Sequence, residues 1–112
     1  MVVGGRGELE PGQVADAASL AAVADGAIVS RKLVEAEGGR VVLFAFDEGQ
    51  ALSEHTTPYE ALVHVLEGVL DVTIAGKGHR VAAGGVIRMP GGVPHALVCR
   101  EPARMMLVML AR

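Results

Sequence analysis

The sequence contains a single cysteine, and this scarcity excludes an internal disulfide among its 112 residues. One thiol suits a reducing compartment, so we expect a cytoplasmic protein. The opening residues, MVVGGRGELEPG, lack the basic start and apolar stretch of a secretory signal peptide, which fits the same expectation.

Aromatic residues and basic clusters are also scarce. Phe44, Phe46 and Tyr59 are the only aromatic residues, and ten basic residues are scattered through a chain of net charge −3. Nucleic-acid surfaces usually combine clustered Lys or Arg with aromatic stacking, so we expect no nucleic-acid partner. The longest apolar runs, at residues 41–46 and 105–111, fall far short of the about 20 residues that span a membrane. We therefore expect no membrane partner.

The chain is rich in aliphatic residues, and its length predicts one domain that buries roughly two thirds of its unfolded surface. Residues 1–12 are rich in glycine and charge, and predict a loose tail or a short edge strand. A helix of one or two turns is predicted only at residues 16–25, where Asp16 can cap it and Gly26 ends it.

From Gly26 onward, apolar or alternating segments between turn residues predict strands. Their expected positions are residues 27–36, 40–46, 50–57, 62–66, 70–74, 79–82, 86–89, 95–100 and 104–110. Gly68 and the pair Glu101-Pro102 are expected to separate neighbouring strands, and residues 76–78 to form a tight turn. This pattern predicts an all-β antiparallel sandwich or barrel.

Two stretches carry the residues that could do chemistry, GQALSEHTTPYEALVHVLEG at 49–68 and GGVIRMPGGVPHALVC at 84–99. Together they resemble the two motifs of the cupin superfamily, G-x5-H-x-H-x(3,4)-E-x6-G and G-x5-P-x-G-x2-H-x3-N. The second motif is nearly complete up to His95, with Cys99 in place of the asparagine. The first retains His55, whereas Thr57 and Ala61 replace its second histidine and its glutamate.

The resemblance implies a cupin-type jelly-roll β-barrel (a double-stranded β-helix) over residues 27–112, preceded by an N-terminal helical or irregular segment over residues 1–26. It also implies a ligand pocket near one end of the barrel. The candidate pocket residues are His55, Thr57, Tyr59, His95 and Cys99. Of the family's metal ligands, only His55 and His95 are carried over to this chain.

Two further residues could complete a metal site. Strand alternation points Ala61 into the barrel and Glu60 outward, unless a β-bulge near Pro58 turns Glu60 inward. Cys99 shares a strand face with His95, and a thiolate is a good ligand for soft metals. The alternative is that Cys99 is a small buried apolar residue.

The residues leave open whether a divalent metal (zinc, iron, nickel or manganese) is bound or absent. The first hypothesis is a binding module whose apolar pocket holds a small molecule through His55 and His95. The second is a metal-dependent enzyme of the dioxygenase, isomerase or decarboxylase type, as the resemblance implies. A third is a structural or regulatory barrel without a substrate.

Three expected strands are apolar on both faces, so their outer faces need a cover. Either the N-terminal segment lies across them, or a second subunit does, and we expect a homodimer. His64 is expected on the outer surface, His79 in a solvated turn, and Met89, Met105, Met106 and Met109 in the core.

Overall fold

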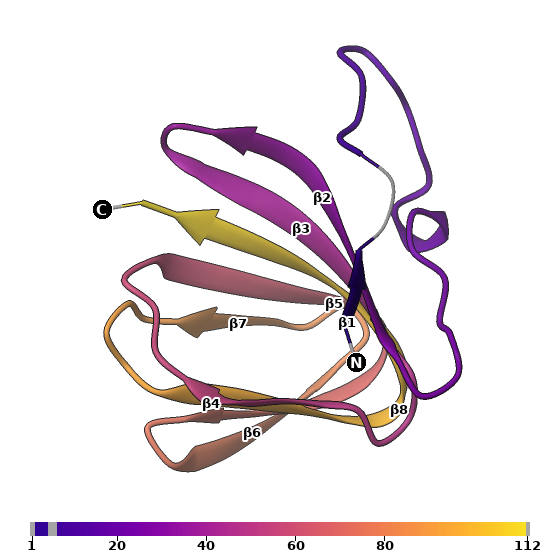
Figure 1. Ribbon diagram of the computed structural model, residues 1–112. Helices are drawn as coiled ribbons and strands as arrows, with labels where there is room; N and C mark the ends of the chain where they lie inside the picture. Colours follow the sequence, from indigo (N-terminus) through magenta and orange to yellow (C-terminus); the bar gives the residue numbers. More distant parts are fainter. Residues whose placement is uncertain (1, 5–6, 112) are drawn as a thin grey trace.

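A computed structural model describes residues 2–4 and 7–111 of the chain. The described strands are β1 (Val2–Gly4), β2 (Ile28–Ala36), β3 (Gly39–Phe46), β4 (Ala51–His55), β5 (Glu60–Ile74), β6 (Lys77–Ala82), β7 (Val86–Met89) and β8 (His95–Leu110). One short 3₁₀ helix, η1, spans Ala17–Ser19. The prediction of an all-β barrel is confirmed, because every long element is a strand (Figure 1).

The strands pair in the order β1-β2-β3-β8-β5-β6, while β4 adds to β8 and β7 adds to β5. All pairings are antiparallel except that of β1 with β2. Figure 1 shows β5 and β8 crossing the molecule, bending and returning, so that each strand contributes to both walls of the barrel. We call the end with these bends the bend end. We call the opposite end of the barrel the loop end. The last residues of β4 and β7 lie there, together with both the first and the last residues of β5 and β8.

The bend at Gly68 was expected to separate two strands, and that expectation is wrong. β5 continues through Gly68 with shifts in its pairing to β8 between Val65 and Leu70. Gly68 has φ +76°, and a Cβ there would lie 2.2 Å from the carbonyl oxygen of Pro102. A glycine is therefore required where β5 folds tightly against the bend of β8, which likewise runs unbroken through Glu101-Pro102.

The barrel interior is filled with aliphatic side chains from both walls. Alternate residues of β5, namely Ala61, Val63 and Val65, are buried, whereas Leu62 between them is exposed. The main core cluster contains Ile28, Phe46, Ala61, Val63, Val65, Leu70, Val72, Val81, Met89, Leu97, Cys99, Ala103 and Met105. The alternation predicted for this strand is therefore present.

The N-terminal segment covers part of the outer face of the sheet. Ala21 forms a second buried cluster with Leu33, Leu43 and Ala45. The Nε of Arg104 donates to the carbonyl oxygen of Ala21 at 2.8 Å and fixes the segment to β8. Of the two covers expected for the outer face of the sheet, the N-terminal segment is therefore present.

The prediction of a helix at residues 16–25 is wrong, because only the single turn of η1 forms in that range. Asp16 stands at its start but its side chain makes no capping hydrogen bond. Without a cap, a short segment gains more from packing its apolar side chains on the sheet than from helical hydrogen bonds. No helix among the described residues has the length and apolar character needed to cross a membrane.

The hairpin between β5 and β6 turns at Ala75 and Gly76, with φ of 51° and 81°. The turn was predicted at residues 76–78, so it lies closer to β5 than predicted, and Lys77 and Gly78 already belong to β6. Consequently His79 is not a turn residue: it lies within β6, half-buried and in register with the buried Val72.

Candidate functional site

Two histidines far apart in the sequence face each other at the loop end of the barrel. The Nε2 atoms of His55 and His95 are 3.1 Å apart, and the ring centroids are 4.3 Å apart with an interplanar angle of 69°. His55 is the last residue of β4 and His95 the first of β8, and the two are register partners. The predicted juxtaposition of the two imidazoles is therefore present in the structure.

Each ring is held by a backbone carbonyl two residues before it. The Nδ1 of His55 lies 2.8 Å from the carbonyl oxygen of Ser53, and the Nδ1 of His95 lies 3.3 Å from that of Val93. A carbonyl oxygen can only accept, so Nδ1 must carry a proton in each of these contacts. The two Nε2 atoms then face each other as acceptors.

Counting protons shows that this pair is incomplete when neutral. The two carbonyl contacts need one proton each and the contact between the Nε2 atoms needs a third, whereas two neutral imidazoles carry only two. The network is complete only when the pair gains a proton or another cation. The pair can therefore serve as an acceptor for a proton or for a hydrogen-bond donor.

The two rings differ in their surroundings. His95 is 5% exposed, whereas His55 is exposed to solvent. Burial lowers the pKa of His95, and the nearby His55 lowers it further, against an opposing effect of the Val93 carbonyl. The lowered pKa favours the neutral, proton-deficient form of His95.

Glu60 does not turn toward the histidines. Its Oε1 accepts from Arg88 Nε at 3.1 Å, and its Oε2 accepts from the backbone N–H of Gly91 at 2.7 Å. The strand pairings show no bulge at the start of β5. Glu60 therefore fixes the β7–β8 loop that leads to His95, and the bulge that would have supplied a carboxylate is not formed.

Cys99 lies inside the barrel but away from the histidines. It follows His95 by four residues of β8, which separates their Cα atoms by roughly 13 Å along an extended strand. Its Sγ donates to the carbonyl oxygen of Glu101 at 2.8 Å, and burial raises the pKa of the thiol. Cys99 is thus a buried apolar residue near the bend end, as the alternative interpretation held.

The two other predicted pocket residues, Thr57 and Tyr59, make different contacts. Thr57 is half-buried and its carbonyl oxygen accepts from the N–H of Gly92, which ties the two loops together. Tyr59 is half-buried, and its ring lies 5.7 Å from the Cζ of Arg40. Sequence reasoning missed Arg40, because only the pairing of β3 with β8 brings it to the loop end.

The donor set does not fit the metal centre that the cupin motifs imply. The two imidazoles have the backbone-anchored Nδ1 that is common in metal-binding histidines. However, a catalytic zinc usually needs three protein ligands, and non-haem iron needs two histidines and a carboxylate. Among the described residues, no three His, Cys, Asp or Glu side chains gather in a group that could hold a metal ion.

Comparison with known proteins establishes the class of protein that this fold and site define. The family model described as the cupin domain matches residues 42–110, which include both histidines and most of the barrel. The chain therefore belongs to the cupin family. No protein of curated function matches it.

Solved structures agree with this assignment. A conserved protein of unknown function from Streptococcus pyogenes is 33% identical, with 94% of this chain and 92% of that chain covered and a TM-score of 0.88. A cupin 2 conserved barrel domain protein from Leptotrichia buccalis is 31% identical over 83% of this chain, with a TM-score of 0.81. This chain spans 45% of that protein's length. A cupin superfamily protein from Desulfitobacterium hafniense is 19% identical over 96% of this chain and 98% of that one, with a TM-score of 0.84, and shares the fold.

Proposed function

We propose that this cupin is a binding module that holds a small molecule at the loop end of the barrel, with His55 and His95 as its polar contacts. The observation that carries this proposal is the proton-deficient contact between the two Nε2 atoms at 3.1 Å. A ligand that supplies a hydrogen-bond donor or a proton completes the network, which gives its binding a favourable free energy.

The surroundings of the pair suit a ligand with an apolar part. Leu52, Ile74 and Ile87 are only partly buried, and pack against the main core cluster. Ile74 is the register partner of His95, and Leu52 lies three residues before His55. Apolar side chains with a few convergent polar groups are typical of small-molecule sites.

The binding proposal is tested by NMR of the imidazole nitrogens during a screen of small acids, amides and alcohols. A ligand of this site is expected to shift the His55 and His95 signals together, and His95→Gln is expected to weaken its binding at least about 10-fold. His64→Ala is the matched control, because His64 lies on the outer side of β5. If binding survives His95→Gln unchanged, the proposed site is wrong.

The alternative hypothesis, a metal-dependent enzyme, is tested by metal analysis. Protein purified without chelator or histidine tag is analysed for metal before and after incubation with zinc, iron, nickel and manganese. A stoichiometric metal that His55→Ala removes would favour the enzyme hypothesis over the metal-free module.

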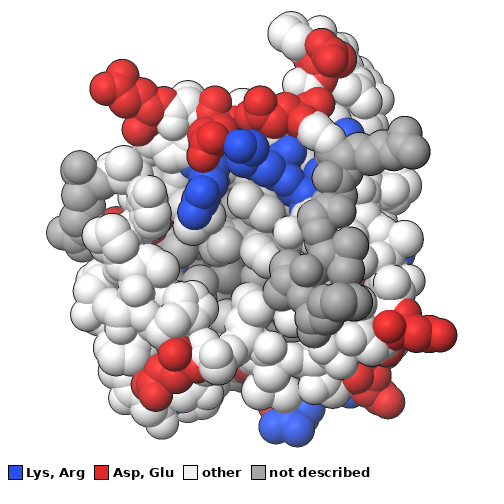
Figure 2. All heavy atoms as spheres, in the orientation of Figure 1, with Lys and Arg blue, Asp and Glu red and all other residues white. Residues whose placement is uncertain are grey.

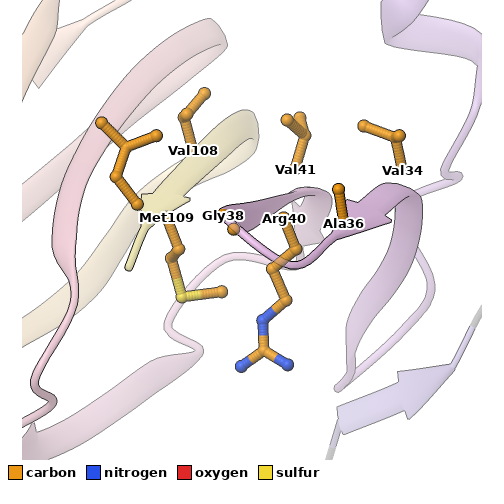
Figure 3. Close-up of a pocket in the computed structure, with 9 residues that line it drawn as sticks. Val34, Ala36, Gly38, Arg40, Val41, Val108 and Met109 are labelled. Carbon is orange, nitrogen blue, oxygen red and sulfur yellow. The ribbon is translucent and has the colours of Figure 1, made fainter. Parts of the chain in front are cut away.

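We also propose that the protein forms a homodimer through the part of its outer sheet that the N-terminal segment leaves open. Val34, Val41, Val108 and Leu62 are successive register partners across β2, β3, β8 and β5, so they form one apolar row on one face. Val34 is 52%, Leu62 41% and Leu110 56% exposed. A hollow of about 230 Å³ lies beside this row, lined by Val34, Val41, Val108 and Leu110 among others (Figure 3).

The face seen in Figure 2 carries side chains of both signs, with a group of basic side chains lying beneath acidic ones near its upper edge. The dimer is tested by sedimentation at micromolar concentration. Leu62→Asp is expected to yield monomers, because it places a charge in the apolar row, whereas Glu54→Lys changes an exposed charge elsewhere and leaves the mass unchanged. A monomeric wild-type protein would contradict the proposal.

A further inference from the structure

Arg40 is a second polar group on the inner side of the loop end. It is the second residue of β3 and the register partner of Met109 of β8. Met109 packs against the main core cluster, and directly paired residues share a face. Figure 3 shows Arg40 and Met109 on one side of the sheet, and Val34, Val41 and Val108 on the other.

The guanidinium of Arg40 has unused hydrogen-bonding capacity. Its Nε is buried, and no group among the described residues accepts a hydrogen bond from it. Its Nη1 forms an ion pair with Glu35 Oε2 at 3.7 Å, which is longer than a hydrogen bond. Buried donors in folded proteins are nearly always paired, so this N–H calls for an acceptor that the chain does not supply.

Arg40 is also held toward the loop that follows the histidine pair. Its Cζ lies 5.7 Å from the centre of the Tyr59 ring, at a distance suited to a cation–π contact. Tyr59 comes four residues after His55, in the connection between β4 and β5. The contact therefore holds the Arg40 guanidinium, with its unpaired Nε, at the same end of the barrel as the histidines.

We infer that Arg40 and the His55–His95 pair together bind the carboxyl group of a small apolar acid. This inference rests on the proposed function and names the class of its ligand. The two groups complement each other: the histidine pair lacks one proton, and the Nε of Arg40 lacks an acceptor. A carboxylate that binds together with one proton from solution supplies both, because the pair takes up the proton and the carboxylate accepts from the guanidinium.

The rest of the ligand is expected to be a short aliphatic chain. Phe44, Leu107 and Met109 are partly buried against the main core cluster and come from the same two strands as Arg40 and its partner. Each methylene that becomes buried removes further apolar surface from water, so longer acids should bind more tightly.

Hexanoate and 1-hexanol are the probes, because they share a chain and differ in the carboxyl group. Titrations are followed through the imidazole nitrogen signals of His55 and His95. We expect hexanoate to bind at least about 10-fold more tightly than 1-hexanol, and Arg40→Met to abolish that preference. Arg80→Met is the matched control, since Arg80 is an exposed residue of β6 paired with Asp71. Thermal melting establishes that each variant is folded, and Arg40→Lys keeps the charge without the planar fork of donors.

The outcomes separate this inference from the proposed function. Should hexanoate keep its preference and its imidazole shifts in Arg40→Met, the role of Arg40 is refuted while the histidine site stands. Tighter binding of inorganic phosphate than of hexanoate would overturn the class of ligand. Imidazole signals that respond to no carboxylate from acetate to decanoate would refute the inference, and a response to amides or alcohols would still support the proposed function.

Discussion

The two ends of the barrel are built from the same strands, yet within residues 2–4 and 7–111 the polar groups left unsatisfied lie at one end. At the bend end, Cys99 donates to Glu101 and Gly68 lies tightly against Pro102. At the loop end, the histidine pair lacks a proton and the Nε of Arg40 lacks an acceptor. The bend end is therefore organised for stability, and the loop end retains groups that a ligand can satisfy.

The largest effect is expected from Gly68→Ala at the bend end. The new Cβ would lie 2.2 Å from the Pro102 carbonyl oxygen, at a residue with φ +76°. We expect the free energy of unfolding to fall by about 3 kcal/mol or more, measured by urea denaturation. Gly76→Ala is the control: it has φ +81° but no atom within 4 Å of the added Cβ, so its cost should be about 1 kcal/mol. Equal losses in the two variants would mean that the close contact at the bend contributes nothing.

An intermediate effect is expected at the loop end, where the two histidines should differ. His95→Ala removes a side chain that is 5% exposed and should lower the free energy of unfolding by about 1 to 3 kcal/mol. His55→Ala removes an exposed ring and should cost about 0.5 kcal/mol or less. Both substitutions should abolish the imidazole response to hexanoate. A larger loss of stability in His55→Ala would contradict the assignment of His95 as the buried member.

The smallest effect concerns the outer face, where Asp71 pairs with Arg80 and Arg100. These hydrogen bonds, that of Arg80 first, lower the pKa of Asp71 from 3.8 to about 2. The folded state binds this proton less readily than the unfolded state, so the stabilisation is present above pH 4 and is lost as the pH falls toward 2. Asp71→Asn should lower stability at pH 7 by less than about 1 kcal/mol and should flatten its acid dependence. An unchanged acid titration of stability in Asp71→Asn would show that the pair is not coupled to folding.

Much of the fold followed from local patterns. Alternation along β5 correctly placed Ala61, Val63 and Val65 inside, and the motif spacing brought His55 and His95 together. The length of β5 and β8 was not predictable, because glycine and proline usually end a strand. Here both strands bend and continue, since each bend packs against the other.

The sequence by itself determined the all-β class, the inward face of β5 and the two histidines, because each depends on local spacing and alternation. Tertiary structure alone decided that Glu60 pairs with Arg88, that Cys99 lies away from the histidines, and that Arg40 reaches the loop end. The physical reason is that register between strands distant in sequence sets which side chains meet, and no local pattern specifies that register.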